Sequence, residues 1–127
     1  MNNEVRLTAE KCASLLGAID DALYVIGGKW KLRVIVALRE GNKRFNDIQR
    51  TVTGISARVL SNELKELEMN GFVKRVVIDQ TPVVVEYQVT VYAQTLGGVL
   101  QSLAEWGFTH RDKIKKERKL KQPAELI

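Results

Sequence analysis

The hydrophobic positions in the first half of the chain recur every three or four residues, which is the spacing of amphipathic helices. Ile19, Leu23 and Ile26 form one such set, and a later leucine set includes Leu60 and Leu64. Ser, Thr, Gly and Asn residues, which are common helix caps, stand at the ends of these sets. We therefore expect four helices, at about residues 8–26, 30–38, 45–52 and 56–70.

The hydrophobic pattern changes after Gly71. The runs FVKRVVI (72–78) and VVVEYQV (83–89) are rich in β-branched and aromatic residues, which favours a β-hairpin with a loop at 79–82. A last helix is predicted to begin at Thr90, as its N-cap, and to reach His110 or further. The charged sequence that follows is compatible with a solvated helical extension or with a disordered tail.

The helix at 56–70 has a polar face opposite its leucines. With Leu60 at zero and about 100° per residue, Leu64 and Leu67 fall within about 40° of it and mark the buried side. The far side, at about 100–200°, contains a guanidinium, a hydroxyl, an amide and an ammonium, from Arg58, Ser61, Asn62 and Lys65. Such groups bind phosphate oxygens and base edges. For the helix alone a solvated face is the favoured interpretation, and the hairpin and the basic block of the chain shift it to DNA contact.

Positive charge is concentrated in two parts of the chain. The 127 residues have a formal net charge of +5. Residues 29–75 contain eleven Lys/Arg and five Asp/Glu, for a net +6, and residues 111–127 contain seven and three, for a net +4. This distribution favours a polyanion as the partner of the central block.

Two helices joined by a short Gly-containing turn and followed by a hairpin form a winged helix-turn-helix. We therefore predict a mainly α fold with a small β-hairpin (α+β), with extra N- and C-terminal helices. In this motif the second helix enters the major groove of double-stranded DNA and the hairpin lies over the backbone. Contacts to the DNA backbone are predicted for Lys43, Arg44, Ser56, Lys74 and Arg75. Strand alternation turns one of the last two toward the helices.

The last predicted helix has a wide apolar face, formed by Tyr92, Leu96, Val99, Leu100, Leu103 and Trp106. One domain of this size covers only part of it, so we expect a second copy of the chain to cover the rest. A two-fold dimer places its recognition helices about one DNA turn, roughly 34 Å, apart and predicts a pseudo-palindromic site. Residues 1–110 would then be a single domain that includes the dimerisation helices, and 111–127 a basic tail.

Several short motifs occur together in the order, and at about the intervals, of a known family. They are Gly27-Gly28-Lys29-Trp30, Arg44-Phe45-Asn46-Asp47-Ile48, Gly54-Ile55-Ser56, Leu60, Leu64-Lys65-Glu66-Leu67, Asn70-Gly71-Phe72-Val73, and Glu86-Tyr87 with Thr90. Over roughly residues 18–106 the chain resembles the HxlR-type bacterial transcriptional regulators, relatives of the MarR winged-helix proteins. The resemblance implies a homodimeric DNA-binding regulator of a nearby operon, with the N- and C-terminal helices at the dimer interface and two wings beside the operator.

The chain differs from this family at the sensing thiol and at the wing tip. Members often have Cys-Pro upstream of the Gly-Gly pair, where a thiol can sense oxidants or electrophiles, but Gly17 occupies that spacing here. Cys12 lies about one helical turn further upstream, so it is either a redox residue or a half-buried structural thiol. The wing loop reads Pro82 to Tyr87 without the usual basic residue.

Other function classes have little support in the sequence. No catalytic triad order, paired acid cluster, phosphate-binding glycine loop or metal-ligand spacing occurs, so we expect no enzyme, metal site or cofactor. The apolar runs are too short to span a bilayer and the N-terminus lacks a signal-peptide layout, so we expect a cytoplasmic protein without a membrane partner. One alternative stays open, a winged-helix module that binds an acidic protein. The sequence does not indicate the effector.

Overall fold

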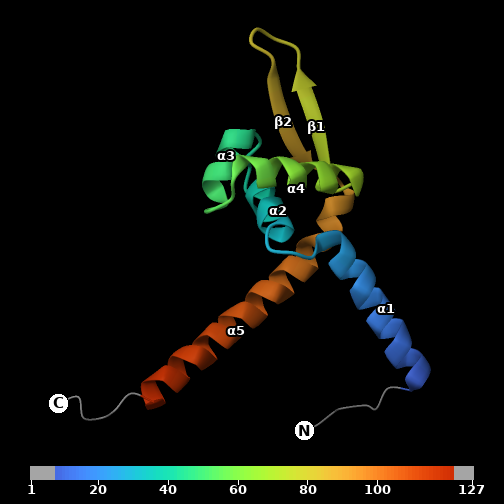
Figure 1. Ribbon diagram of the computed structural model, residues 1–127, viewed down its shortest axis with the longest axis vertical. Helices are drawn as coiled ribbons and strands as arrows, with labels where there is room; N and C mark the ends of the chain where they lie inside the picture. Colours follow the sequence, from blue (N-terminus) through green and yellow to red (C-terminus); the bar gives the residue numbers. More distant parts are fainter. Residues whose placement is uncertain (1–7, 122–127) are drawn as a thin grey trace, which may run out of the picture. The chain divides into compact units, whose positions relative to one another are not determined.

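The computed structural model describes residues 8–121. Two compact units divide between Thr90 and Val91. The first unit contains α1 (Ala9–Ile26), α2 (Lys31–Arg39), α3 (Phe45–Thr51), α4 (Ala57–Met69), β1 (Val73–Ile78) and β2 (Val84–Val89) (Figure 1). The second contains a 3-10 helix, η1 (Tyr92–Leu96), and the long helix α5 (Gly97–Lys121). The four helices and the hairpin predicted in the first 90 residues are thus confirmed, and the fold is a mainly helical winged helix-turn-helix.

The core of the first unit is built where α2, α3 and α4 pack together. Val34 and Ile35 from α2, Ile48 from α3, and Leu60 and Leu67 from α4 have no exposed surface. Burying a side chain of this size stabilises the fold by about 1.5–3 kcal/mol relative to leaving it in water. The leucine stripe that the sequence predicted for the helix at 56–70 is therefore the stripe that is buried.

The hairpin is tied to the helices near its base. β1 and β2 are antiparallel, and Val73 pairs with Val89 while Ile78 pairs with Val84. The Tyr87 N–H donates to the carbonyl of Lys43 at 2.8 Å, which joins β2 to the segment before α3. Val73 is buried at the base of the hairpin. The wing therefore has a fixed position relative to α3 and α4.

Two glycines make the sharp turns around α4. Gly54 (φ +90°), before the helix, and Gly71 (φ +81°), after it, both have left-handed backbone conformations that other L-residues rarely adopt. Between them the hydroxyl of Ser56 caps α4 by accepting a hydrogen bond from the Val59 N–H at 3.2 Å. The predicted boundaries of this helix are confirmed.

The predicted start of the last helix is wrong. The 3-10 helix η1 has Val91, and not Thr90, at its N-cap position, and α5 begins only at Gly97. The Thr90 hydroxyl donates to the Gly71 carbonyl at 2.6 Å, and the Thr90 N–H donates to the Phe72 carbonyl at 3.1 Å. These bonds hold the end of the hairpin, so the chain enters a 3-10 turn before α5 begins at Gly97. α5 continues past His110 to Lys121, and the basic sequence is helical to that point. Residues 122–127 lie outside the described residues.

The helices outside the helix-turn-helix core have no buried residue of their own. None of the residues of α1 or α5 is buried. α1 has the predicted N-cap, Thr8, whose hydroxyl accepts a hydrogen bond from the Lys11 N–H at 3.1 Å. None of the helices described is both long and apolar enough to cross a membrane.

Candidate nucleic-acid interface

The polar face predicted for α4 is present in the structure. Arg58, Asn62 and Lys65 are exposed, and Ser61 is half-buried at the edge of the same face. On the opposite side of the helix Leu60, Leu64 and Leu67 are buried. The amphipathic spacing therefore separates one side that anchors α4 from one side that can meet a ligand.

The turn between α3 and α4 is held by side chains that the sequence did not single out. The guanidinium of Arg33 donates to the Thr53 carbonyl at 3.2 Å. The amide of Gln49 donates to the Ile55 carbonyl at 3.3 Å. Both bonds satisfy carbonyl groups in a tight turn, where the backbone lacks helical partners. They fix the angle at which α4 follows α3.

The start of α2 carries a cluster of cations around an aromatic ring. The Lys29 ammonium lies 4.7 Å from the centroid of the Trp30 ring, and the Arg33 guanidinium lies 4.8 Å from it. Such cation–π contacts contribute about 0.5–1 kcal/mol each at exposed sites. The Trp30 ring therefore holds two positive charges at the start of α2.

A third cation at the start of α2 bonds to α4. The Lys31 ammonium lies 2.7 Å from Oε1 of Glu63 and 3.3 Å from Oε2 of Glu66. Burial alone lowers the pKa of Lys31, but the hydrogen bonds and negative charges of Glu63 and Glu66 outweigh it and raise the pKa above its ordinary value of 10.5. While Glu63 and Glu66 are ionised, the stabilisation from these pairs is present below about pH 10.5 and is lost as the pH rises through the higher folded-state pKa of Lys31.

The basic residues predicted to contact the DNA backbone are exposed. Lys43 and Arg44 precede α3, and both have exposed side chains. In β1, Lys74 pairs with Gln88 and Arg75 with Tyr87, so the two cations point to opposite faces of the hairpin, as predicted. Both are nevertheless exposed. The wing can therefore present positive charge near its base from either face.

The tip of the wing is apolar rather than basic. Val77 and Val83 are exposed there. The sequence from Val76 to Val85 contains no Lys or Arg and one acid, Asp79. Electrostatic contact with a phosphate backbone is accordingly concentrated at the base of the hairpin.

Apolar side chains are also exposed on α1 and, separately, on α5. In α1 the exposed set includes Leu16 and Leu23, and in α5 it includes Leu103, 54% exposed, and Trp106, 65% exposed. Four of the six residues predicted at a dimer interface are exposed: Tyr92, Val99, Leu103 and Trp106. Leu100 is half-buried. Leu96 is buried within the single chain, so its side chain is not available to a second copy.

Cys12 lies on α1 and is exposed and free. The interpretation of a half-buried thiol is therefore wrong for the single chain. Within residues 8–121 no group of three or more His, Cys, Asp or Glu is arranged to hold a metal ion.

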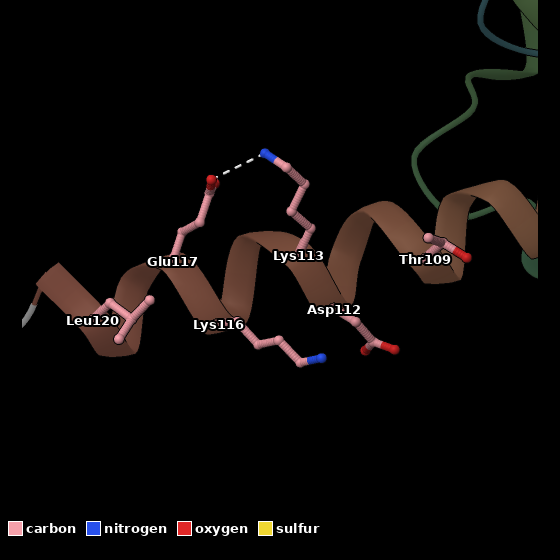
Figure 2. Close-up of a pocket in the computed structure, with 6 residues that line it drawn as sticks. All are labelled: Thr109, Asp112, Lys113, Lys116, Glu117 and Leu120. Carbon is pink, nitrogen blue, oxygen red and sulfur yellow. Dashed lines mark hydrogen bonds and ion pairs between the residues drawn. The ribbon is translucent and has the colours of Figure 1, made fainter. Parts of the chain in front are cut away.

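A hollow of about 410 Å³ lies along the charged end of α5 (Figure 2). All six of its lining residues come from this one helix, and Figure 2 shows them spread along its surface, with the Lys113 ammonium bonded to Oε2 of Glu117 at 2.9 Å. A single helix does not enclose a ligand. The α4 face and its basic surroundings are therefore the stronger candidate site.

The family model of the HxlR-like helix-turn-helix matches residues 25–115, from the end of α1 through most of α5. The chain belongs to the HxlR-like family of transcriptional regulators. The family expected from the order of the short motifs is thus confirmed. As an HxlR-like regulator the protein has a helix-turn-helix that binds DNA, and it is not an enzyme.

Named relatives and a solved structure agree with this family. The uncharacterized HTH-type transcriptional regulator YtcD of Bacillus subtilis (strain 168) is 36% identical over 97 residues, which are 76% of this chain and 77% of YtcD. YybR of the same organism, described in the same words, is 39% identical over 100 residues, 79% of this chain and 80% of YybR. The redox regulator HypR in its reduced form superimposes with a TM-score of 0.72 at 38% identity, covering 78% of this chain and 98% of HypR.

Proposed function

We propose that the protein regulates transcription as a homodimer that binds a pseudo-palindromic operator. The observation that carries this proposal is the division of α4, whose leucines are buried while Arg58, Asn62 and Lys65 are exposed on the other side. A helix that is anchored on one side and polar on the other has the form of a recognition helix in the major groove.

Each residue of the interface has a role that follows from its chemistry. Asn62 has the amide donor and acceptor that pair with adenine, and Arg58 and Lys65 are suited to guanine or to phosphate. Ser61 reaches the groove from the edge of the face, since it is half-buried. The Ser56 end of α4 and the cations Lys43, Arg44, Lys74 and Arg75 bind the DNA backbone and set the position of the dimer.

The second copy is proposed because α1 and α5 both leave apolar side chains in water. Leu23 on α1 is 60% exposed, and Leu103 and Trp106 on α5 are more than half exposed. A two-fold dimer that covers these faces brings two α4 helices to one side of the DNA, with half-sites about one turn, roughly 34 Å, apart. In this proposal residues 1–110 act as one DNA-binding and dimerising domain, residues 111–127 are its basic extension, and the protein acts in the cytoplasm.

A redox response at Cys12 stays a prediction. The exposed thiol lies on α1, one of the helices assigned to the dimer. If oxidation of Cys12 controls the protein, diamide should change operator binding by the wild type and should have no effect on Cys12→Ser. An equal effect of diamide on both proteins would show that Cys12 does not control operator binding.

The test of the proposed function is binding to DNA at several salt concentrations. Purified protein is titrated with the intergenic DNA upstream of its own gene and with a scrambled fragment of the same length. We expect preference for the upstream fragment and a steep fall in affinity with salt, with a slope of about −0.9 for each phosphate contacted. Weak binding to both fragments at every salt concentration would contradict the proposal and favour the protein-interaction module.

A further inference from the structure

Lys31 occupies a position that is unfavourable within its own helix. It is the first residue of α2, and α2 has no acidic residue in its first turn. The N-terminus of a helix carries partial positive charge, so an ammonium group there is destabilising. The side chain is also only 12% exposed, so water compensates little of its charge.

The compensation comes from α4. Glu63 and Glu66 stand one turn apart on that helix, and Lys31 is within hydrogen-bond distance of both. Without a cation between them, two carboxylates at this spacing repel each other. The Glu63 side chain is 13% exposed, whereas that of Glu66 is 55% exposed. One ammonium therefore neutralises a largely buried carboxylate and also holds a second one at the surface.

The second carboxylate borders the polar face of α4. At about 100° per residue, Glu66 lies about 40° around the helix from Asn62, on the side away from Lys65. A carboxylate at the edge of a groove-binding face repels the phosphates that line the groove. Its bond to Lys31 turns it toward α2, and the ammonium leaves the two carboxylates with one net negative charge in place of two.

We propose that Lys31 is a positioning residue for DNA binding, which fixes α4 to α2 and masks the Glu66 carboxylate from the phosphates. This inference rests on the proposed function, because it assumes that the polar face of α4 meets DNA. Lys31 itself touches no DNA in this account. Its effect on DNA binding acts through Glu66. When Glu66 carries no charge, loss of Lys31 should therefore no longer weaken DNA binding.

The experiment compares Lys31→Met, Glu66→Gln and the double variant Lys31→Met/Glu66→Gln with the wild type. Lys113→Met is the matched control, because it removes the same charge from an exposed ion pair on α5. Affinity is measured for the upstream and the scrambled fragments at low and high salt. Thermal unfolding of each variant identifies a temperature at which all of them are folded.

We expect Lys31→Met to weaken binding to both fragments by roughly tenfold at low salt and by less at high salt. The reason is that the unpaired Glu66 carboxylate repels the phosphates, and salt screens this repulsion. Adding Glu66→Gln should restore most of the loss. Lys113→Met should stay within about twofold of the wild type, since surface pairs of this kind contribute little. Should Lys31→Met not fold, Lys31→Gln keeps a donor for Glu63 and allows the same comparison.

A folded Lys31→Met protein that binds DNA as the wild type does would overturn the inference. A loss that Glu66→Gln does not restore would also overturn it, since Lys31 would then serve only the fold. Wild-type protein that binds neither fragment refutes the proposed function itself. Wild-type binding with unchanged binding by the Lys31 variant refutes only the role of Lys31.

Discussion

The helix-turn-helix core and the helix α5 use their apolar residues in opposite ways. In the core, Val34, Ile35 and Leu60 are completely buried. In α5, no residue is buried, and Leu103 and Trp106 are more than half exposed. The first region is complete within one chain. The second leaves large apolar side chains at the surface of the single chain.

This difference indicates that the core determines the folding stability of the chain, whereas α1 and α5 determine its association with a second chain. Apolar patches that a single chain leaves in water mark sites for protein association. The core therefore needs no partner to hold α4 in place, whereas α1 and α5 gain stability only when another surface covers them. We infer that the core orients α4 within one chain. Association through α1 and α5 would then bring a second α4 to the same DNA.

The largest difference between the two regions is expected when a leucine in each is replaced by alanine and the free energy of unfolding is measured. Leu60→Ala should lower the free energy of unfolding by about 2–5 kcal/mol at every protein concentration, because it leaves a cavity in the core. Leu103→Ala should have a smaller effect that grows with protein concentration, since it acts on the dimer. Urea unfolding curves of both variants, recorded at two protein concentrations, measure these losses. Equal, concentration-independent losses would contradict the separation of the two regions.

The next effect concerns assembly alone. Leu103→Asp should raise the dimer dissociation constant at least about 100-fold, because the interface would bury a carboxylate without a partner. Leu120→Asp is the control, as this side chain is also on α5 but is 85% exposed and follows the predicted interface residues, which end at Trp106. Sedimentation equilibrium compares the two. A Leu103→Asp protein that stays dimeric would place the interface elsewhere.

A smaller effect on DNA affinity should distinguish residues of the core that contact bases from those that contact the DNA backbone. Asn62→Ala should weaken the operator complex by about 1–3 kcal/mol and leave random DNA almost unchanged, because an amide on α4 pairs with a base edge. Lys43→Ala should weaken both complexes alike, since phosphate contacts are independent of sequence. Parallel titrations measure this. Equal losses on both DNAs for Asn62→Ala would rule out its base-reading role.

The smallest effect compares two helix caps of the same kind. The hydroxyl of Ser56 caps α4 and that of Thr8 caps α1, each by accepting one backbone N–H bond. Ser56→Ala should cost about 1 kcal/mol of unfolding free energy, the usual value for a lost N-cap. Thr8→Ala should cost less under conditions where the protein is monomeric, because α1 has no buried residue. A larger loss for Thr8→Ala would show that α1 packs within one chain.

Local patterns in the sequence predicted most of the first unit. The leucine spacing of α4, its cap Ser56 and the turn at Gly71 depend on neighbours within a few residues, so the boundaries of α4 and its polar face could be predicted. The Lys31 bridge joins residues 32 and 35 positions apart, which no local pattern encodes. The hydrogen bond from the Thr90 hydroxyl to the Gly71 carbonyl joins residues 19 positions apart, so the local pattern at the start of the last helix did not reveal it. The burial of Leu96 likewise depends on tertiary packing.

The central claim is that a second copy of the chain covers the apolar faces of α1 and α5. Sedimentation velocity of the wild type, at the concentrations where it binds its upstream DNA, tests this most directly. The account predicts a species of twice the 14.3 kDa chain mass. A protein that remains at 14.3 kDa while it binds that DNA with full affinity would contradict the account.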